Sequence, residues 1–117
     1  MVKKVDCLKF KYECLDAKQE FVLESTLQFT AQKPIDQSLL ERAILVDFNA
    51  AGDENKFKLN CVCRVIFSFP EKEDVVEDKE LLQRHQQEAY EQLQLLINNT
   101  LVAMGQHKIS LPEIDFD

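Results

Sequence analysis

The sequence has 117 residues, of which 45% are apolar and 30% are charged, with only two glycines and three prolines. A chain of this size and composition is expected to form one ordered globular domain over residues 1–117 rather than a linker or a disordered tail. The net charge is −7, and the acidic excess lies wholly within residues 71–117. No basic stripe opposes it, so nucleic acid is not an expected partner.

The start of the sequence has no signal-peptide pattern, and no segment reaches the 18 apolar residues of a membrane span. We therefore expect a cytoplasmic protein that does not insert into a membrane. Disulfides are rare in the cytosol, so the four cysteines, Cys7, Cys14, Cys61 and Cys63, are expected to be reduced apolar residues of strands.

Four segments alternate apolar and polar side chains, which is the pattern of half-buried strands. They cover residues 6–14, 19–32, 42–50 and 56–69. The first places Leu8, Phe10 and Tyr12 on one face. The other apolar faces are Phe21, Leu23, Leu27 and Phe29, then Ile44, Val46, Phe48 and Ala50, and then Phe57, Leu59, Cys61, Cys63, Val65, Phe67 and Phe69. The segment 51–55 between the last two strands is rich in turn formers, which predicts a hairpin.

A long amphipathic helix is predicted over residues 79–104, where apolar residues recur at spacings of three, four or seven. They are Leu82, Ala89, Leu93, Leu96, Ile97, Leu101 and Met104. Asp74 and Glu77 have the spacing of a capping box, with Asp78 as an alternative cap, and Gly105 is placed to end the helix. The predicted fold is therefore α+β, a four-stranded antiparallel sheet covered by one long C-terminal helix.

The second half of this helix is apolar on almost every side, although one sheet can cover only one face. We therefore expect this half to meet other copies of the chain. The predicted oligomer interface consists of Leu93, Leu95, Leu96, Ile97, Leu101 and Val102. Beyond the helix, Ile109, Leu111, Ile114 and Phe116 predict a tail that folds back onto the body.

The sequence contains few residues that could carry catalysis. His85 and His107 are its only histidines, and His85 is expected to be a packed helix residue. Cys61 and Cys63 lack the C-x-x-C spacing of a metal-chelating hairpin, and no phosphate-binding or nucleophile motif is present. We expect no enzyme activity, no catalytic residues, no metal and no cofactor.

The hairpin RAILVDFNAAGDENKFKLNCVCRVIFSF, the long helix and the ending MGQHKISLPEIDF resemble the SecB family of export chaperones and small bacterial SecB-like proteins. The resemblance spans nearly the whole chain. It implies a four-stranded antiparallel sheet, a homotetramer built as a dimer of dimers, and ATP-independent holding of unfolded chains in apolar grooves. The sheet acids with which SecB docks the SecA motor are replaced by Lys58 and Asn60, which puts docking to SecA in doubt.

The leading functional hypothesis is a SecB-like chaperone that binds unfolded or exported polypeptides. The alternative is an oligomeric adaptor or scaffold with the same fold and no general holding activity. A groove between sheet and helix would expose alternating apolar and aromatic residues to a client. The candidate client-binding residues are Phe21, Phe29, Phe57 and Phe67.

Overall fold

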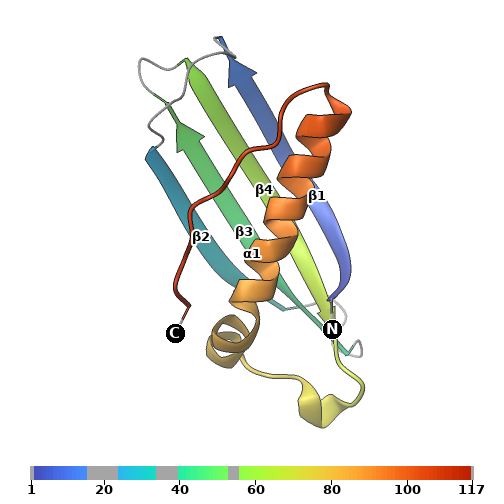
Figure 1. Ribbon diagram of the computed structural model, residues 1–117. Coiled ribbons are helices and arrows are strands. Elements are labelled where there is room, and N and C mark those ends of the chain that lie inside the picture. Colours follow the sequence, from blue (N-terminus) through green and yellow to red (C-terminus); the bar gives the residue numbers. More distant parts are fainter. Residues whose placement is uncertain (1, 16–23, 34–39, 53–55, 117) are drawn as a thin grey trace.

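The computed structural model describes residues 2–15, 24–33, 40–52 and 56–116, and a four-stranded antiparallel sheet forms its main layer (Figure 1). The strands are β1 (Val2–Cys14), β2 (Glu24–Gln32), β3 (Glu41–Ala51) and β4 (Phe57–Ser68), in the spatial order β1-β4-β3-β2. A short 3-10 helix, η2 (Lys72–Asp74), precedes the long helix α1 (Asp78–Ala103). The α+β fold predicted from the sequence is confirmed.

The register of the sheet places the alternating apolar residues of its two central strands on one face. Val46 of β3 lies opposite Cys63 of β4, and Phe48 lies opposite Cys61. The predicted apolar faces are confirmed for Ile44, Val46, Phe48, Ala50, Phe57, Leu59, Cys61, Cys63, Val65 and Phe67, which are all buried. Phe69, also expected on this face, lies beyond the end of β4 and is half-buried. The backbone N–H of Gly52 donates to the carbonyl of Phe57 (2.9 Å), as expected where β3 returns into β4.

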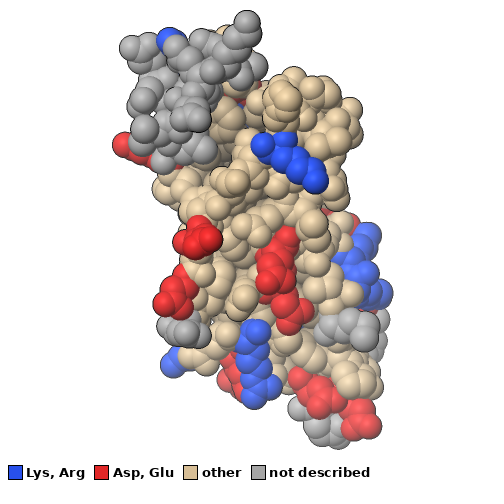
Figure 2. Space-filling model, viewed as in Figure 1, with Lys and Arg blue, Asp and Glu red and all other residues tan. Residues whose placement is uncertain are grey.

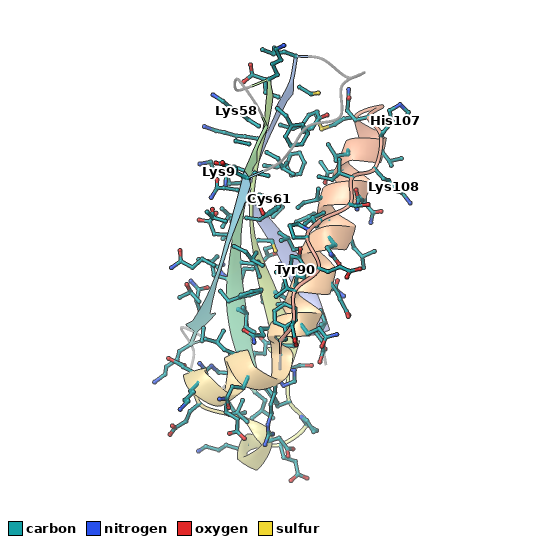
Figure 3. The ribbon with its side chains drawn as sticks, turned by 60° about the vertical axis from the view of Figure 1, so that its left-hand side comes forward. Lys9, Lys58, Cys61, Tyr90, His107 and Lys108 are labelled. Carbon is teal, nitrogen blue, oxygen red and sulfur yellow. The ribbon has the colours of Figure 1, made fainter. Side chains whose placement is uncertain are left out.

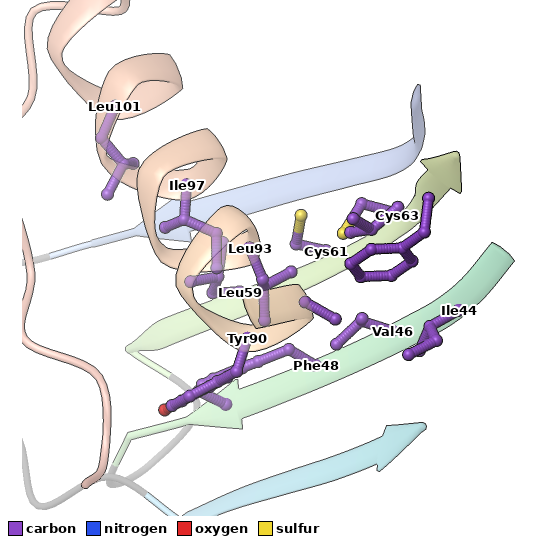
Figure 4. Packing of buried hydrophobic residues seen from close by; sticks show 14 of the residues in the cluster. Ile44, Val46, Phe48, Leu59, Cys61, Cys63, Tyr90, Leu93, Ile97 and Leu101 are labelled. Carbon is purple, nitrogen blue, oxygen red and sulfur yellow. The ribbon is translucent and has the colours of Figure 1, made fainter. Parts of the chain in front are cut away.

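Helix α1 covers this apolar face and contacts β2, β3 and β4 (Figure 1). Figure 4 shows Leu93, Ile97 and Leu101 directed from the helix toward the sheet. The buried helix residues are Leu81, Ala89, Tyr90, Leu93, Ile97 and Leu101. Leu82 and Leu96 of the predicted stripe are half-buried and pack against this core, whereas the prediction was wrong for Met104, which lies beyond the last helical turn and is 50% exposed.

The two ends of α1 differ in how their backbone groups are satisfied. At the C-terminus, Gln106 donates to the carbonyl of Leu101 (2.8 Å) and Gly105 donates to that of Val102 (3.0 Å). With Gly105 at a φ of 78°, this is the left-handed glycine cap predicted from the sequence. At the N-terminus the predicted cap was wrong, because Glu77 occupies the cap position and makes no side-chain capping bond.

Strand β1 departs from the predicted alternation. Its register against β4 shifts between Cys7 and Lys9, which is a β-bulge or comparable irregularity. A bulge adds one residue to one strand and so reverses the parity beyond it. Leu8, expected on the buried face with Phe10, is instead 47% exposed, whereas Phe10 packs against the core. The strand also begins earlier than the expected residue 6.

No helix in the described part of the chain is both long enough and apolar enough to cross a membrane. The face of the sheet opposite α1 carries polar and charged side chains, and Figure 3 shows Lys9 and Lys58 pointing away from the helix on that side. The predicted second strand began at residue 19, and its residues 19–23 lie outside the described residues.

Candidate functional site

The C-terminal segment 106–116, here called the tail, runs back from the end of α1 across the apolar side of the sheet toward β2 (Figure 1). It lies in a space bounded by α1, β2 and β3, which we call the tail groove. A remaining cavity of about 240 Å³ in this groove is lined by Ser25 of β2, Phe48 and Ala50 of β3, and tail residues 109–112. The predicted folding back of the tail is thus confirmed.

Tyr90 of α1 forms one anchor of the tail. Tyr90 is 4% exposed, and its hydroxyl donates to the backbone carbonyl of Pro112 (2.5 Å). Burial raises the pKa of the Tyr90 hydroxyl, and a hydrogen bond with Gln94 partly offsets this effect. A tyrosine hydroxyl is protonated near neutral pH in any case, and the upward shift extends its role as a hydrogen-bond donor to more alkaline pH.

Asn98, two turns further along α1, forms a second anchor. Its side-chain oxygen accepts a hydrogen bond from the backbone N–H of Ile109 (2.8 Å). The glycine cap at Gly105 turns the chain back after the helix and so brings Ile109 alongside Asn98. Both anchors therefore bind backbone groups of the tail rather than its side chains.

Phe116 anchors the far end of the tail through its ring. Its centroid lies 5.9 Å from that of Phe29 on β2, in a T-shaped arrangement, and 5.9 Å from that of Tyr90. Ile109 and Leu111 also pack against the core, whereas Ile114 is 36% exposed. The groove thus combines apolar side-chain contacts with one backbone donor and one backbone acceptor of the bound segment.

The structure separates the four candidate client-binding residues. Phe29 lines the tail groove, whereas Phe57 and Phe67 are 4% and 0% exposed within the core. Phe67 packs against His85 of α1, so a ligand could reach that ring only after the helix moved off the sheet. Phe21 lies outside the described residues. A role for the four in client binding stays a prediction, and Phe29 is the one that already contacts an extended segment.

The candidate oligomer residues also fall into two groups. Leu93, Ile97 and Leu101 are fully buried against the chain's own sheet, and Leu96 is half-buried. Leu95 and Val102 are 55% and 51% exposed and lie two turns apart on the outer side of α1. Figure 2 shows a largely uncharged surface over the C-terminal half of this helix. Only the outer pair is open to another chain without a change in the fold.

A larger hollow of about 670 Å³ lies on the other face of the sheet, at the end where all four strands contribute. Lys11, Lys58, Glu13 and Glu24 give it charges of both signs. Beside it, Asp47 accepts hydrogen bonds from Asn49 (3.1 Å) and Asn60 (3.3 Å). Because side chains of both charges line the hollow, it favours neither an anionic nor a cationic ligand. Its lining residues include no nucleophile beside a base.

The cysteines and the histidine on the apolar side of the sheet are packed among core residues. The pKa values of the Cys61 and Cys63 thiols are raised to about 12, first by burial and then by neighbouring thiols. His85 packs on the ring of Phe67, with centroids 4.9 Å apart, and its Nδ1 lies 3.2 Å from Glu88. Within the described ranges, no three His, Cys, Asp or Glu side chains converge as a metal site requires.

Sequence reasoning missed Tyr90 and Asn98 as the two anchors. Tyr90 could have been found, because it shares the three- and four-residue spacing of Leu93, Ile97 and Leu101 and adds a hydroxyl to that stripe. Asn98 carries no comparable signal. Its role depends on where the chain passes after Gly105, which helical spacing does not reveal.

No protein-family model and no curated protein matches the sequence. Among solved structures, the chain is similar to the Mycobacterium tuberculosis Rv1957 SecB-like chaperone in complex with a ChAD peptide from the Rv1956 HigA1 antitoxin. The TM-score is 0.65 at 6% sequence identity, over 98% of this chain and 90% of that one. At this identity the likeness concerns the fold alone. The chain therefore has a SecB-like α+β fold, as its sequence suggested.

Proposed function

We propose that this chain binds extended apolar segments of unfolded or precursor polypeptides in the tail groove, as an ATP-independent chaperone of the SecB kind. The observation that carries the proposal is the tail itself, an extended apolar segment held in the groove through its backbone as well as its side chains. The SecB-like neighbour in complex with a peptide supports the same kind of partner.

The proposed activity needs neither catalysis nor a cofactor. Apolar walls bind apolar side chains, and Tyr90 and Asn98 satisfy backbone groups that would otherwise lose their bonds to water. We accordingly expect no enzymatic turnover and no nucleotide dependence. Docking to SecA is not part of the proposal, since Lys58 and Asn60 on the outer face replace the acids with which SecB docks SecA.

We also propose that the protein is a homo-oligomer, with a dimer of dimers as the expected form. The exposed apolar side chains of Leu95 and Val102 on α1 support this, because a second chain could cover both at once. The same surface favours the alternative function, an oligomeric adaptor that binds one folded partner and holds no unfolded chains.

The test is suppression of aggregation. Two unrelated proteins, each diluted from denaturant, should scatter less light in the presence of stoichiometric amounts of this chain, with or without ATP. An arginine introduced by Ser25→Arg projects a charge into the groove and should abolish the effect, because a charge in an apolar site is strongly disfavoured.

The matched control is Thr26→Arg, one position along β2 and on the opposite face of the sheet. It adds the same charge to the same strand, and it should leave the suppression of aggregation unchanged. If the chain suppresses aggregation of neither client, the adaptor reading replaces the chaperone reading. Equal loss in both variants would place client binding outside the tail groove.

A further inference from the structure

The hydrogen bonds that hold the tail in the groove depend very little on the amino-acid sequence of the tail. Asn98 accepts from the backbone N–H of Ile109, and Tyr90 donates to the backbone carbonyl of Pro112. Every polypeptide offers carbonyl groups, and every residue except proline offers an N–H group. The two hydrogen-bonding anchors would therefore serve any extended chain that entered the groove.

The side-chain contacts of the tail require apolar residues at only a few of its positions. Ile109 and Leu111 pack against the core two residues apart, and Phe116 fills a place between the rings of Phe29 and Tyr90 five residues later. The intervening residues 112–115 are exposed. A foreign segment with apolar residues at these positions would make the same contacts, with an aromatic residue preferred at the last one.

The hold on the tail is also modest compared with a strand of the sheet. The bonds from Tyr90 and Asn98 are each a single contact between a side chain and the tail backbone, and residues 112–115 of the tail are exposed. Segments with few buried apolar contacts and exposed backbone open with low free energies. The tail can thus leave the groove while the sheet and α1 remain folded.

From these contacts we infer that the tail is a resident competitor of the groove, which a client segment displaces. This inference rests on the proposed function and adds a regulatory contact to it. The expected ligand is an extended peptide with apolar residues at the first and third positions and an aromatic residue at the eighth, as in Ile109, Leu111 and Phe116. The apparent affinity for such a ligand is reduced by the fraction of molecules whose tail occupies the groove.

The experiment uses the full chain and a fluorescent synthetic peptide with the sequence of residues 106–116, QHKISLPEIDF. Its binding is measured by anisotropy to the natural chain, to the double variant Leu111→Ser/Phe116→Ser, and to the control Ile114→Ser. The double variant weakens the chain's own tail and leaves intact every residue of α1, β2 and β3 that bounds the groove. The control removes a comparable apolar side chain that is 36% exposed and lies in the same tail.

We expect the double variant to bind the peptide about tenfold more tightly than the natural chain, and Ile114→Ser to bind it as the natural chain does. Adding the peptide to the natural chain should also speed hydrogen exchange at the amide of Ile109, because displacement removes its bond to Asn98. Equal affinities in the three proteins, or an unchanged exchange rate at saturating peptide, would overturn the inference.

A second peptide, of unrelated sequence with the same apolar spacing, separates this inference from the proposed function. If it binds all three proteins equally and Ser25→Arg blocks it, the groove binds polypeptides and the tail does not compete. If neither peptide binds any of the proteins, the proposed function and the competitor role are both wrong. Tighter binding of both peptides to the double variant supports both.

Discussion

The guanidinium of Arg42, at the start of β3, is paired with the carboxylate of Asp78, the first residue of α1. Arg42 is 5% exposed and also donates to the backbone carbonyls of Gln32 on β2 and Val76 before the helix. A single buried cation thus joins the end of β2, the start of β3 and the start of α1. It supplies the helix start with a contact that the predicted capping box does not.

Removing the carboxylate should destabilise the fold without abolishing it. In Asp78→Ala, Arg42 keeps its two carbonyl partners but loses its counter-charge while still buried. We expect a loss of about 1–3 kcal/mol in the free energy of unfolding, measured by urea titration. Asp74→Ala, an exposed acid in η2, is the control and should change stability by less than about 0.5 kcal/mol. Equal effects of the two substitutions would contradict the role given to Arg42.

Because the register of β1 shifts after Cys7, we expect substitutions at Leu8 and Phe10 to differ in their effect on stability, whereas regular alternation would predict similar effects. Leu8 is 47% exposed, so Leu8→Thr should change the free energy of unfolding by no more than about 0.5 kcal/mol. Phe10 packs against the core, so Phe10→Thr should cost about 1–3 kcal/mol. Urea midpoints of the two variants decide the point, and similar losses would mean that the strand keeps regular alternation through residue 8.

These two residues illustrate what the sequence could and could not predict. The faces of β3 and β4 were readable because every second residue from Ile44 to Ala50 and from Phe57 to Phe67 is buried, without interruption. In β1 the irregularity after Cys7 changes which alternate residues face the core, and no residue type at that point of the sequence indicates it. Alternation predicts a face only as long as the register holds.

The candidate site was less predictable than the fold, for a different physical reason. The apolar residues of the tail indicated that it packs on the body, but the anchors at Tyr90 and Asn98 bind backbone groups. Backbone groups are the same at nearly every position, so such contacts leave no pattern in the sequence. Phe57 and Phe67 lie in the core, and an aromatic residue in an alternating strand has the same sequence pattern whether it lines a groove or the core.

Alkaline pH should destabilise the protein through its buried thiols. Burial raises the pKa of both Cys61 and Cys63 from the ordinary 9.0 to about 12. Above pH 9 the unfolded chain releases these protons while the folded chain retains them, so stability falls as the pH rises toward 12. The slope is at most about 1.4 kcal/mol per pH unit for each thiol.

Urea midpoints between pH 8 and 11, measured with a reductant present, test this dependence. The variant Cys61→Val/Cys63→Val replaces both thiols by side chains of similar size that do not titrate, and it should show a shallower decline. Tyr90 contributes to the slope that remains, because burial raises its pKa as well. A decline as steep in the variant as in the natural chain would show that the thiols ionise early in the folded state.

The exposed apolar residues Leu95 and Val102 on α1 lead to a prediction about the assembly of the protein. Leu95 is 55% exposed and lies outside the stripe formed by Leu93, Ile97 and Leu101, so an arginine there does not disturb the chain's own core. In an oligomer that covers Leu95, the substitution Leu95→Arg buries an unpaired charge, which costs several kcal/mol and is enough to dissociate subunits. Light scattering should show the molecular mass falling while the circular dichroism spectrum is unchanged. Gln83→Arg, an exposed position in the first half of α1, adds the same charge and should leave the mass unaltered. If the natural chain is already a monomer at concentrations of tens of micromolar, Leu95 and Val102 are ordinary surface residues and the proposed oligomer is wrong.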